Sequence, residues 1–193
     1  MQTHVFTPRF VVSRLHERHK PEVLAHLTEL DPEDRVLRFE ALTSDATLAS
    51  YVSGINFERD CCLGLRNEGG RLVGFAHVAN YRDAAELGIS VDRTLRGLGC
   101  GERLMVDGLR WAKLSGFKTF VVLTSKANHA MLGLAKKYGA RTRYDGGCAC
   151  AEIDLSTLPG ARLFGGTAEA ASPQPESEGR DAAVATHELG LAA

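Results

Sequence analysis

Several features that would point away from an ordinary folded domain are missing from the sequence. No apolar run approaches the roughly 20 residues needed to cross a bilayer, and the first residues lack a basic stretch followed by a long apolar segment. Lys and Arg are scattered, and the formal net charge over 193 residues is -1. These absences argue against membrane insertion and nucleic-acid binding. We therefore expect a soluble, cytoplasmic chain with neither a membrane nor a nucleic-acid partner.

The cysteines do not form a disulfide framework. Their number is odd, five, and they include the close neighbours Cys61 and Cys62 and the pair Cys148 and Cys150. We expect reduced thiols, and no metal site, because nothing near the Cys-x-Cys pair completes four ligands. Cys100 falls at a predicted helix N-terminus, which would lower its thiol pKa. A small side chain accommodated in a tight loop is the simpler interpretation of this cysteine.

The composition changes near the C-terminal end. Residues 156–193 are rich in Ala, Gly, Pro, Ser and Glu and have few large apolar side chains. Such a segment buries too little apolar surface to offset the entropy of ordering. We therefore predict one folded domain over residues 1–155 and a disordered tail over residues 156–193.

Strand and helix patterns both occur along the predicted domain. Strands are predicted at 8–15, 61–67, 71–79, 86–91, 118–125 and 148–155. Helices are predicted at 19–30, 32–39, 45–55, 101–113 and 128–139. Pro21 and Pro32 fall in first turns, while Asp31 and Ser44 are placed as N-caps.

The order of these elements predicts an α+β fold with a mixed sheet. The turn-forming residues 68–70 predict an antiparallel hairpin between the second and third strands. The strand, helix and strand over 86–125 predict a parallel pair, because such crossovers are right-handed connections within one sheet.

The motif RGLGCG, residues 96–101, joins a predicted strand to a predicted helix. Its glycines allow backbone torsions and close approach that a Cβ forbids, and the first amides of the helix have no partner within it. A diphosphate suits such a turn, with Arg96 adding positive charge. An ordinary glycine-rich connection is the alternative. A Walker loop needs Gly-Lys-Ser/Thr, and a Rossmann turn comes near the start of a parallel sheet, so both fit less well.

This turn resembles the Q/R-x-x-G-x-G/A signature of the GNAT superfamily of N-acetyltransferases. Asn128 at the start of the next helix and KKYGA at 136–140 extend the likeness, which covers Phe10 to Leu155. The segments LDPEDRVLRF and NHAMLGLAKKYGA are similar to the acetyltransferase domain of bacterial Pat-type protein-lysine acetyltransferases. The resemblance implies a mostly antiparallel mixed sheet that splays beside its fourth strand, with helices on its faces.

The resemblance also implies acetyl-CoA as co-substrate and direct transfer to a primary amine, without an acyl-enzyme and without a metal. The acceptor is then a protein lysine or a small amine. The diphosphate would lie on the amides of Leu98 to Glu102, and the pantetheine arm along the preceding strand. The implied cofactor-binding residues are Ile89, Ser90, Val91, Arg96, Gly97, Leu98, Gly99, Cys100, Gly101, Glu102 and Asn128.

Amines are mostly protonated near neutral pH, so transfer needs a base that removes a proton. Glu86 is the candidate: it starts the strand that would bind the thioester, and the resemblance places the catalytic glutamate of the Pat type there. Period-two alternation sends Glu86 to the face opposite Leu87, unless a bulge intervenes. The alternatives for Glu86 are a solvated charge or an ion-pair partner of Arg82.

The general acid of the family has no obvious counterpart. The family's usual tyrosine position is Ala135, and Tyr138 lies almost one helical turn further, which favours packing over catalysis. Water, Ser125 or Asn128 remain as proton donors. His77 is expected to be a partly exposed polar residue.

Three alternative functions remain open at this stage. One is a small-molecule enzyme of the same fold, acting on a polyamine, an aminoglycoside or an amino acid. Another is a non-catalytic sensor that binds acyl-CoA, and a third is an interaction module that acts through the tail. The chain could be a monomer or a homodimer.

Overall fold

The computed structural model describes residues 10–160 and Leu163. In this part of the chain seven strands form one sheet in the order β1-β2-β3-β4-β5-β7-β6. The strands are β1 (Val11–Arg14), β2 (Cys61–Arg66), β3 (Leu72–Tyr81), β4 (Ala84–Val91), β5 (Thr119–Ser125), β6 (Arg141–Asp145) and β7 (Cys148–Asp154). The helices are η1 (Glu17–His19), α1 (Lys20–Thr28), α2 (Pro32–Phe39), α3 (Asp45–Gly54), η2 (Arg93–Leu95), α4 (Cys100–Leu114) and α5 (His129–Lys137).

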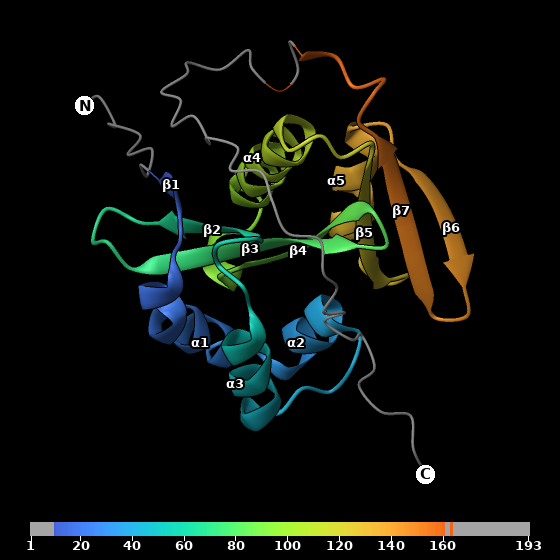
Figure 1. Cartoon of the computed structure of the whole chain (residues 1–193). Coiled ribbons are helices and arrows are strands. Elements are labelled where there is room, and N and C mark those ends of the chain that lie inside the picture. Colours follow the sequence, from blue (N-terminus) through green and yellow to red (C-terminus); the bar gives the residue numbers. More distant parts are fainter. Residues whose placement is uncertain (1–9, 161–162, 164–193) are drawn as a thin grey trace, which may run out of the picture.

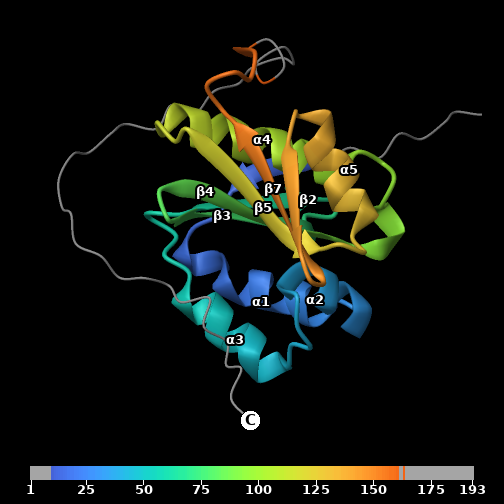
Figure 2. The same ribbon diagram turned by 90° about the vertical axis from the view of Figure 1, so that its right-hand side faces the viewer.

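Helices cover both faces of the sheet. Helices α1, α2 and α3 lie on one face, and α4 and α5 lie on the other (Figures 1 and 2). All neighbouring strands are antiparallel except β4 and β5, which are parallel. The fold is therefore the α+β class with a mixed, mostly antiparallel sheet that the sequence predicts.

The helix starts follow the predicted local signals. Pro32 lies in the first turn of α2, with Asp31 at the N-cap position, and Ser44 caps α3 by accepting a hydrogen bond from the amide of Thr47. Asp31 has the extended backbone of an N-cap, but its side chain pairs with Arg93 at 3.1 Å and does not cap the helix. Asp31 thus connects α2 to the segment that follows β4.

One strand was missed by the sequence prediction. β6 (Arg141–Asp145) pairs with β7 through the turn at Gly146 and Gly147 and lies at the edge of the sheet. Its residues are polar and largely exposed, so no apolar alternation marks it. An edge strand of this kind is held by its backbone pairing, which the side-chain pattern does not reveal.

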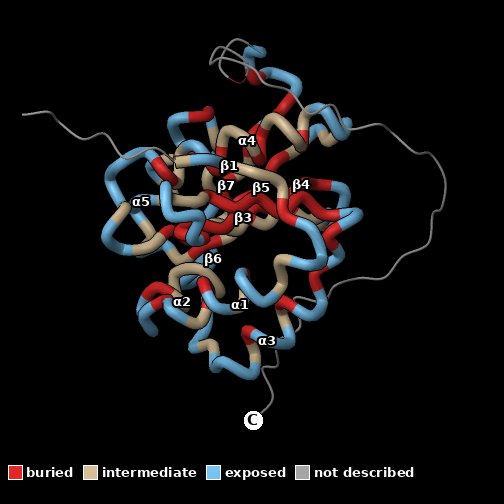
Figure 3. Tube along the Cα trace, turned by 90° about the vertical axis from the view of Figure 1, so that its left-hand side faces the viewer, coloured by how far each residue is buried: buried red, intermediate tan, exposed pale blue. Residues whose placement is uncertain are grey.

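Two clusters of buried side chains fill the spaces between the sheet and its helices. Figure 3 shows that buried residues, in red, gather along the central strands. One cluster joins the sheet to the apolar face of α4, including Leu104, Met105 and Leu109, as the spacing of this helix predicts. The other joins the opposite face to α1 and α3 through Leu27 and Leu48. Burial on both faces fixes the position of β4, from which the candidate site is built.

β4 and β5 pair over a very short length. Only Ala85 with Phe120 and Glu86 with Val121 are in register, and beyond this point the strands diverge. Figure 1 shows β7 and β6 at a steep angle to β2, β3 and β4. On its other edge β4 stays paired with β3 from Ala84 to Val91 without a register shift. The sheet is therefore splayed beside its fourth strand, as the resemblance implies.

The chain beyond β7 stays in contact with the domain. Leu158 and Leu163 are buried, and Lys113 donates hydrogen bonds from Nζ to the carbonyls of Leu155 and Leu158. The packed core thus continues past Leu155. The rest of the predicted disordered tail, 161–162 and 164–193, lies outside the described residues. None of the described helices has both the length and the apolar character needed to cross a membrane.

Candidate active site

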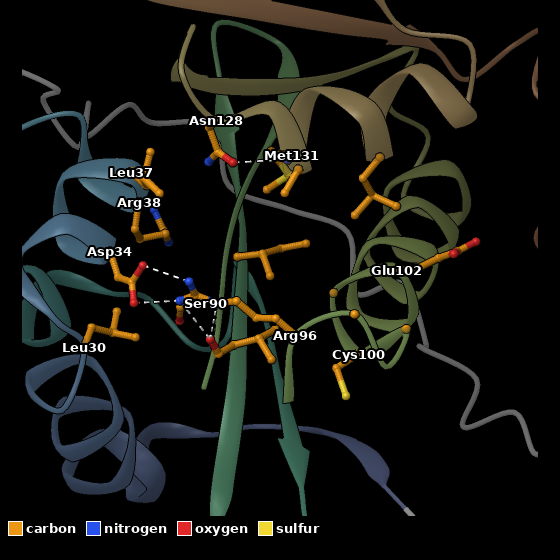
Figure 4. A pocket seen from close by; sticks show the side chains of 17 residues that line it. Leu30, Asp34, Leu37, Arg38, Ser90, Arg96, Cys100, Glu102, Asn128 and Met131 are labelled. Atoms are coloured by element: carbon orange, nitrogen blue, oxygen red, sulfur yellow. Dashed lines mark hydrogen bonds and ion pairs between the residues drawn. The ribbon is translucent and has the colours of Figure 1, made fainter. Parts of the chain in front are cut away.

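A cleft of about 460 Å³ opens where β4 and β5 diverge (Figure 4). Its walls come from α2, from β4, from the glycine turn with the start of α4, and from the start of α5. The lining residues are Leu30, Asp34, Leu37, Arg38, Ile89, Ser90, Val91, Arg96, Gly97, Gly99, Cys100, Gly101, Glu102, Asn128, Ala130, Met131 and Leu134. Of the sequence-predicted site residues, Glu86 and Leu98 do not line the cleft, and the other ten do.

The glycine turn has the backbone that its sequence suggests. Gly97 and Gly99 have φ angles of +76° and +80°, in the left-handed region that favours glycine. Gly101 has no such φ angle, and a Cβ added there would meet nothing within 4 Å. The absence of a side chain at Gly101 is therefore not required by the protein's own packing, and it leaves open space in front of α4.

The backbone amides of the turn are available to a ligand. Gly99 is the N-cap of α4 and has no side chain to cap it, and the first amide to find an acceptor is that of Arg103, which bonds the Gly99 carbonyl at 3.0 Å. The amides of Leu98 to Glu102 donate to no backbone carbonyl among the described residues. These donors, together with the positive end of the helix dipole, can hold an anion. A diphosphate fits this arrangement.

Arg96 forms a bidentate pair with Asp34 of α2. Nη1 donates to Oδ1 at 2.9 Å, and Nη2 lies 2.7 Å from Oδ2. The Asp34 side chain is buried, and its hydrogen bond with the Arg96 guanidinium lowers the pKa of the carboxyl. In this arrangement the charge of Arg96 is already paired, so this residue connects the glycine turn to α2 (Figure 4).

Asn128 holds the opposite wall in place. Its Oδ1 accepts the amide of Met131 at 3.1 Å as the N-cap of α5, and its Nδ2 donates to Thr124 at 2.9 Å. Thr124 lies within donating distance, 3.4 Å, of the Leu37 carbonyl at the end of α2. These bonds link the start of α5 to β5 and to α2 on either side of the cleft.

Glu86 lies at the point where the sheet opens. It is half-buried and is the last residue of β4 that pairs with β5. The register of β4 is continuous, so Glu86 shares the α1–α3 face with Gly88, as the alternation predicts. The guanidinium of Arg82, the alternative partner of Glu86, lies 5.0 Å from the ring centroid of Tyr81.

Tyr138 packs at the junction of α4 and α5. Its side chain is buried, and its hydroxyl donates to Glu102 Oε1 at 2.8 Å. Lys137 donates to the same oxygen at 2.5 Å, and the hydrogen bonds from Lys137 and Tyr138 lower the pKa of Glu102. Ala135, at the position of the family's usual tyrosine, is fully buried. These contacts agree with the packing role that the sequence suggests for Tyr138.

The expectation that Cys100 has a lowered pKa is wrong. The thiol is buried, and desolvation raises its pKa more than the hydrogen bond to its own backbone lowers it. All five cysteines are free thiols, and Cys148 and Cys150 are the two that are not buried.

A buried histidine fixes Ser90 from behind the cleft. His26 Nε2 lies 2.9 Å from the hydroxyl of Ser90, and Nδ1 lies 3.3 Å from Asp92 Oδ1. Burial lowers the pKa of His26 to about 4, so the ring is neutral at pH 7. Nδ1 has no hydrogen bond of acceptable geometry, so these residues do not form the aligned triad of a serine hydrolase.

The sequence prediction missed the α2 wall and most of the α5 wall. Asp34 and Arg38 are one helical turn apart on α2, and Met131 and Leu134 lie on α5. Gly88 was the available signal, because a glycine within a buried strand often marks a close approach by another group. The guanidinium of Arg38 makes that approach.

Comparisons with known proteins agree with this geometry. A sequence model of the Acetyltransferase (GNAT) family matches residues 24–140. A solved chain from Acinetobacter baylyi, described as an acetyltransferase, has a TM-score of 0.66 and 22% identity, and the alignment covers 81% of this chain and 96% of that one. The GNAT domain of S. lividans PAT has a TM-score of 0.63 and 16% identity, with 79% and 99% covered. Spermidine N-acetyltransferase from Vibrio cholerae, solved with CoA and spermine, has a TM-score of 0.59 and 15% identity, with 76% and 96% covered.

A comparison with curated protein sequences gives no match. The splayed sheet and its donor-rich cleft are those of an acyl-CoA-dependent transferase fold. The chain belongs to the acetyltransferase (GNAT) family, and its activity class is acetyl-CoA-dependent N-acetyl transfer.

Proposed function

We propose that this protein moves the acetyl group of acetyl-CoA directly to a primary amine, with Glu86 as the general base. The carrying observation is the run of amides from Leu98 to Glu102 that donate to no backbone carbonyl among the described residues, directly beside the opened edge of β4. The diphosphate binds these amides. The pantetheine arm follows Ile89 to Val91, whose edge toward β5 is not paired in the described register, and Asn128 borders the same path.

Glu86 takes the proton that the attacking amine must lose. Its place at the end of the β4–β5 pairing supports this role, because a pantetheine arm that follows β4 from Val91 to Ile89 would carry the thioester toward this end of the opening. The amine nitrogen then forms a bond to the acetyl carbon as the carbon–sulfur bond breaks. A thiol pKa of about 8.5 lies near neutral pH, so the sulfur can leave as thiolate and take its proton from water. No tyrosine acid is needed for this step.

Activity without an acyl-enzyme is supported by the side chains in the cleft. Cys100 lines it, but burial raises the pKa of its thiol, which disfavours the nucleophilic thiolate. The acceptor is a protein lysine or a small amine. We also propose that all residues that act in the transfer lie within residues 1–155. The segment up to Leu163 contributes packing only.

The test measures thiol release from acetyl-CoA with a panel of amines, for the wild type and Glu86→Gln. We expect Glu86→Gln to lower kcat by about 10²- to 10³-fold, as loss of a general base does, with acetyl-CoA affinity within about twofold in calorimetry. Glu58→Gln, at an exposed and remote position, is the matched control. Tight acetyl-CoA binding by the wild type without turnover on any amine would favour the sensor alternative. Equal turnover by wild type and Glu86→Gln would exclude Glu86 as the base.

A further inference from the structure

Arg38 is a cation that lines the cleft and has no carboxylate partner among the described residues. It lines the cleft from α2, is half-buried, and forms no ion pair in that part of the chain. Its neighbours differ, because Arg35 pairs with Asp45 and Arg96 pairs with Asp34. The Nε of Arg38 is buried without a hydrogen-bond acceptor. A buried donor of a charged group is costly unless something accepts its hydrogen bond.

The guanidinium lies directly on β4. Its central carbon is 2.1 Å from the position that a Cβ of residue 88 would take, and both terminal nitrogens are 2.2 Å from it. Only a glycine at position 88 leaves room for this group. Figure 4 shows Arg38 beside Leu37 on the α2 side of the cleft. The backbone of β4 at Gly88 thus limits how closely the Arg38 guanidinium approaches the sheet.

A chain of hydrogen bonds fixes the orientation of Arg38. Nη2 donates to the hydroxyl of Tyr51 at 3.0 Å, so the Tyr51 proton is directed to Nδ1 of His77 at 2.8 Å. His77 then carries its proton on Nε2, 3.2 Å from the buried carboxylate of Asp60. Burial acts to raise the pKa of Asp60, but the hydrogen bond from His77 and the neighbouring Arg59 guanidinium act in the opposite direction, and the pKa is lowered. Each of these three hydrogen bonds has a defined donor and acceptor, and together they hold the guanidinium of Arg38 in one position.

Arg38 and Glu86 act on the same face of β4. Arg38 covers Gly88, and Glu86 precedes that glycine by two residues, a spacing of roughly 7 Å along a strand. A molecule with an amine and a carboxylate on one carbon can span this distance with a hydrogen bond on either side. The planar guanidinium matches a carboxylate in bidentate geometry. A polycationic amine would meet like charge at Arg38.

We propose that Arg38 binds the carboxylate of the acceptor, so that the amine acetylated by this enzyme belongs to an amino acid or a similar small amino carboxylic acid. This inference rests on the proposed function, because Glu86 must deprotonate the amine while Arg38 holds the carboxylate. Arg38 selects the acceptor, and the glycine turn holds the donor. The two sites therefore respond to different variants.

The experiment compares free L-amino acids with the corresponding amino-acid amides, which keep the amine and lose the carboxylate charge. For the wild type we expect kcat/KM to be at least about tenfold higher for the acids. Arg38→Gln should lower kcat/KM for the acids by about 10- to 100-fold through KM, as expected for loss of a charged hydrogen bond, and leave the amides within about threefold. Arg38→Lys should give an intermediate value. Arg18→Gln, at an exposed site, is the control.

Gly88→Ala provides a second, independent variant. A methyl group at residue 88 displaces the guanidinium, so it should reproduce the loss of acid selectivity with Arg38 still present. Gly133→Ala, where an added Cβ meets nothing within 4 Å, should behave like the wild type. Binding of the amino acid and its amide to the CoA-loaded protein, followed by calorimetry, tests the same selectivity without turnover.

Equal use and equal binding of acids and amides by the wild type would overturn the proposal. So would a variant effect on the donor: if Arg38→Gln instead abolished a preference for malonyl-CoA over acetyl-CoA, the carboxylate would belong to the acyl group. Failure of the proposed function would look different. In that case wild type would bind no acetyl-CoA, or would bind it and transfer to no amine, whichever acceptor is present.

Discussion

Arg96 and Asp34 hold the glycine turn against α2 through two contacts of 2.9 and 2.7 Å. The two residues are far apart in sequence, and their pairing closes one side of the cleft over Ser90 and Val91. The Asp34 carboxylate is buried, while Arg96 is 41% exposed, so the pair lies between a surface and a buried ion pair in strength.

We expect Asp34→Asn to lower the free energy of unfolding by about 1 to 3 kcal/mol, because Arg96 then loses its charged partner. The pKa of Asp34 is lowered in the folded state, so the contribution of this pair is present above the ordinary aspartate pKa and is lost as the pH falls below it. Urea unfolding at pH 7 and pH 3.5 measures both effects. Glu33→Gln, next to it and exposed, is the control, and an equal loss in both variants would contradict the prediction.

Gly101→Val separates ligand binding from folding. The position has no positive φ angle, and an added Cβ has free space, so the melting temperature should change by only a few degrees. The side chain would occupy the space in front of the amides, and we expect the Kd for acetyl-CoA to rise at least tenfold, about 1.4 kcal/mol. Calorimetry with pure protein checks this. If the folded variant bound acetyl-CoA with unchanged affinity, the diphosphate could not bind at this turn as we propose.

His26 should give the protein a pH-dependent stability. Burial lowers its pKa to about 4 in the folded state, whereas the unfolded histidine titrates near 6.5. The unfolded chain therefore binds the proton first, so stability is full above pH 6.5 and falls by about 3 kcal/mol as the pH drops from 6.5 to 4.

Denaturant unfolding of wild type and His26→Gln between pH 7 and pH 4 tests this slope. The difference between the two curves cancels the titration of groups that do not contact His26. We expect most of the fall in the free energy of unfolding that His26 causes between pH 6.5 and pH 4 to be absent from His26→Gln. His129→Gln, on an exposed side chain, should keep the wild-type slope, and a wild-type slope in His26→Gln would show that His26 is not the group responsible.

Two truncations test where the folded unit ends. A chain that stops after Leu155 loses the buried side chains of Leu158 and Leu163 and the carbonyl acceptors of Lys113 and Arg110 beyond that point. We expect it to lose about 3 kcal/mol or more of stability, since each buried leucine contributes roughly 1.5 to 3 kcal/mol. A chain that stops after Leu163 should unfold like the full chain and retain acetyl transfer. Chemical unfolding and thiol-release assays of both chains measure this.

The sequence was sufficient for most elements of the fold, because local signals agreed with the final packing. Ser44 is the N-cap of α3, the residues around 68–70 form the predicted hairpin turn, and the apolar side of α4 is buried as its spacing indicates. β6 was not predictable in this way, because its polar residues carry no alternation.

The residues of the candidate site likewise fall into those that the sequence predicted and those that it did not. Residues from one continuous stretch, Ile89 to Glu102, could be named in advance because the strand, the glycine turn and the helix start are neighbours in the chain. Arg38 and Asp34 could not, since their place in the cleft depends on how α2 packs on β4. The sequence also did not give the direction of the Cys100 pKa shift, because burial raises this pKa by more than backbone hydrogen bonding at the helix N-terminus lowers it.

By itself, then, the sequence determined the fold class, the family signature and the glycine turn, all of which follow from short-range backbone chemistry in RGLGCG and its flanking strand and helix. Only the tertiary structure decided that Arg96 is paired with Asp34, and that Arg38 fills the space left by Gly88. The physical reason is that these contacts join groups about 50 or more residues apart, and their energies depend on distance and burial, which no local pattern specifies.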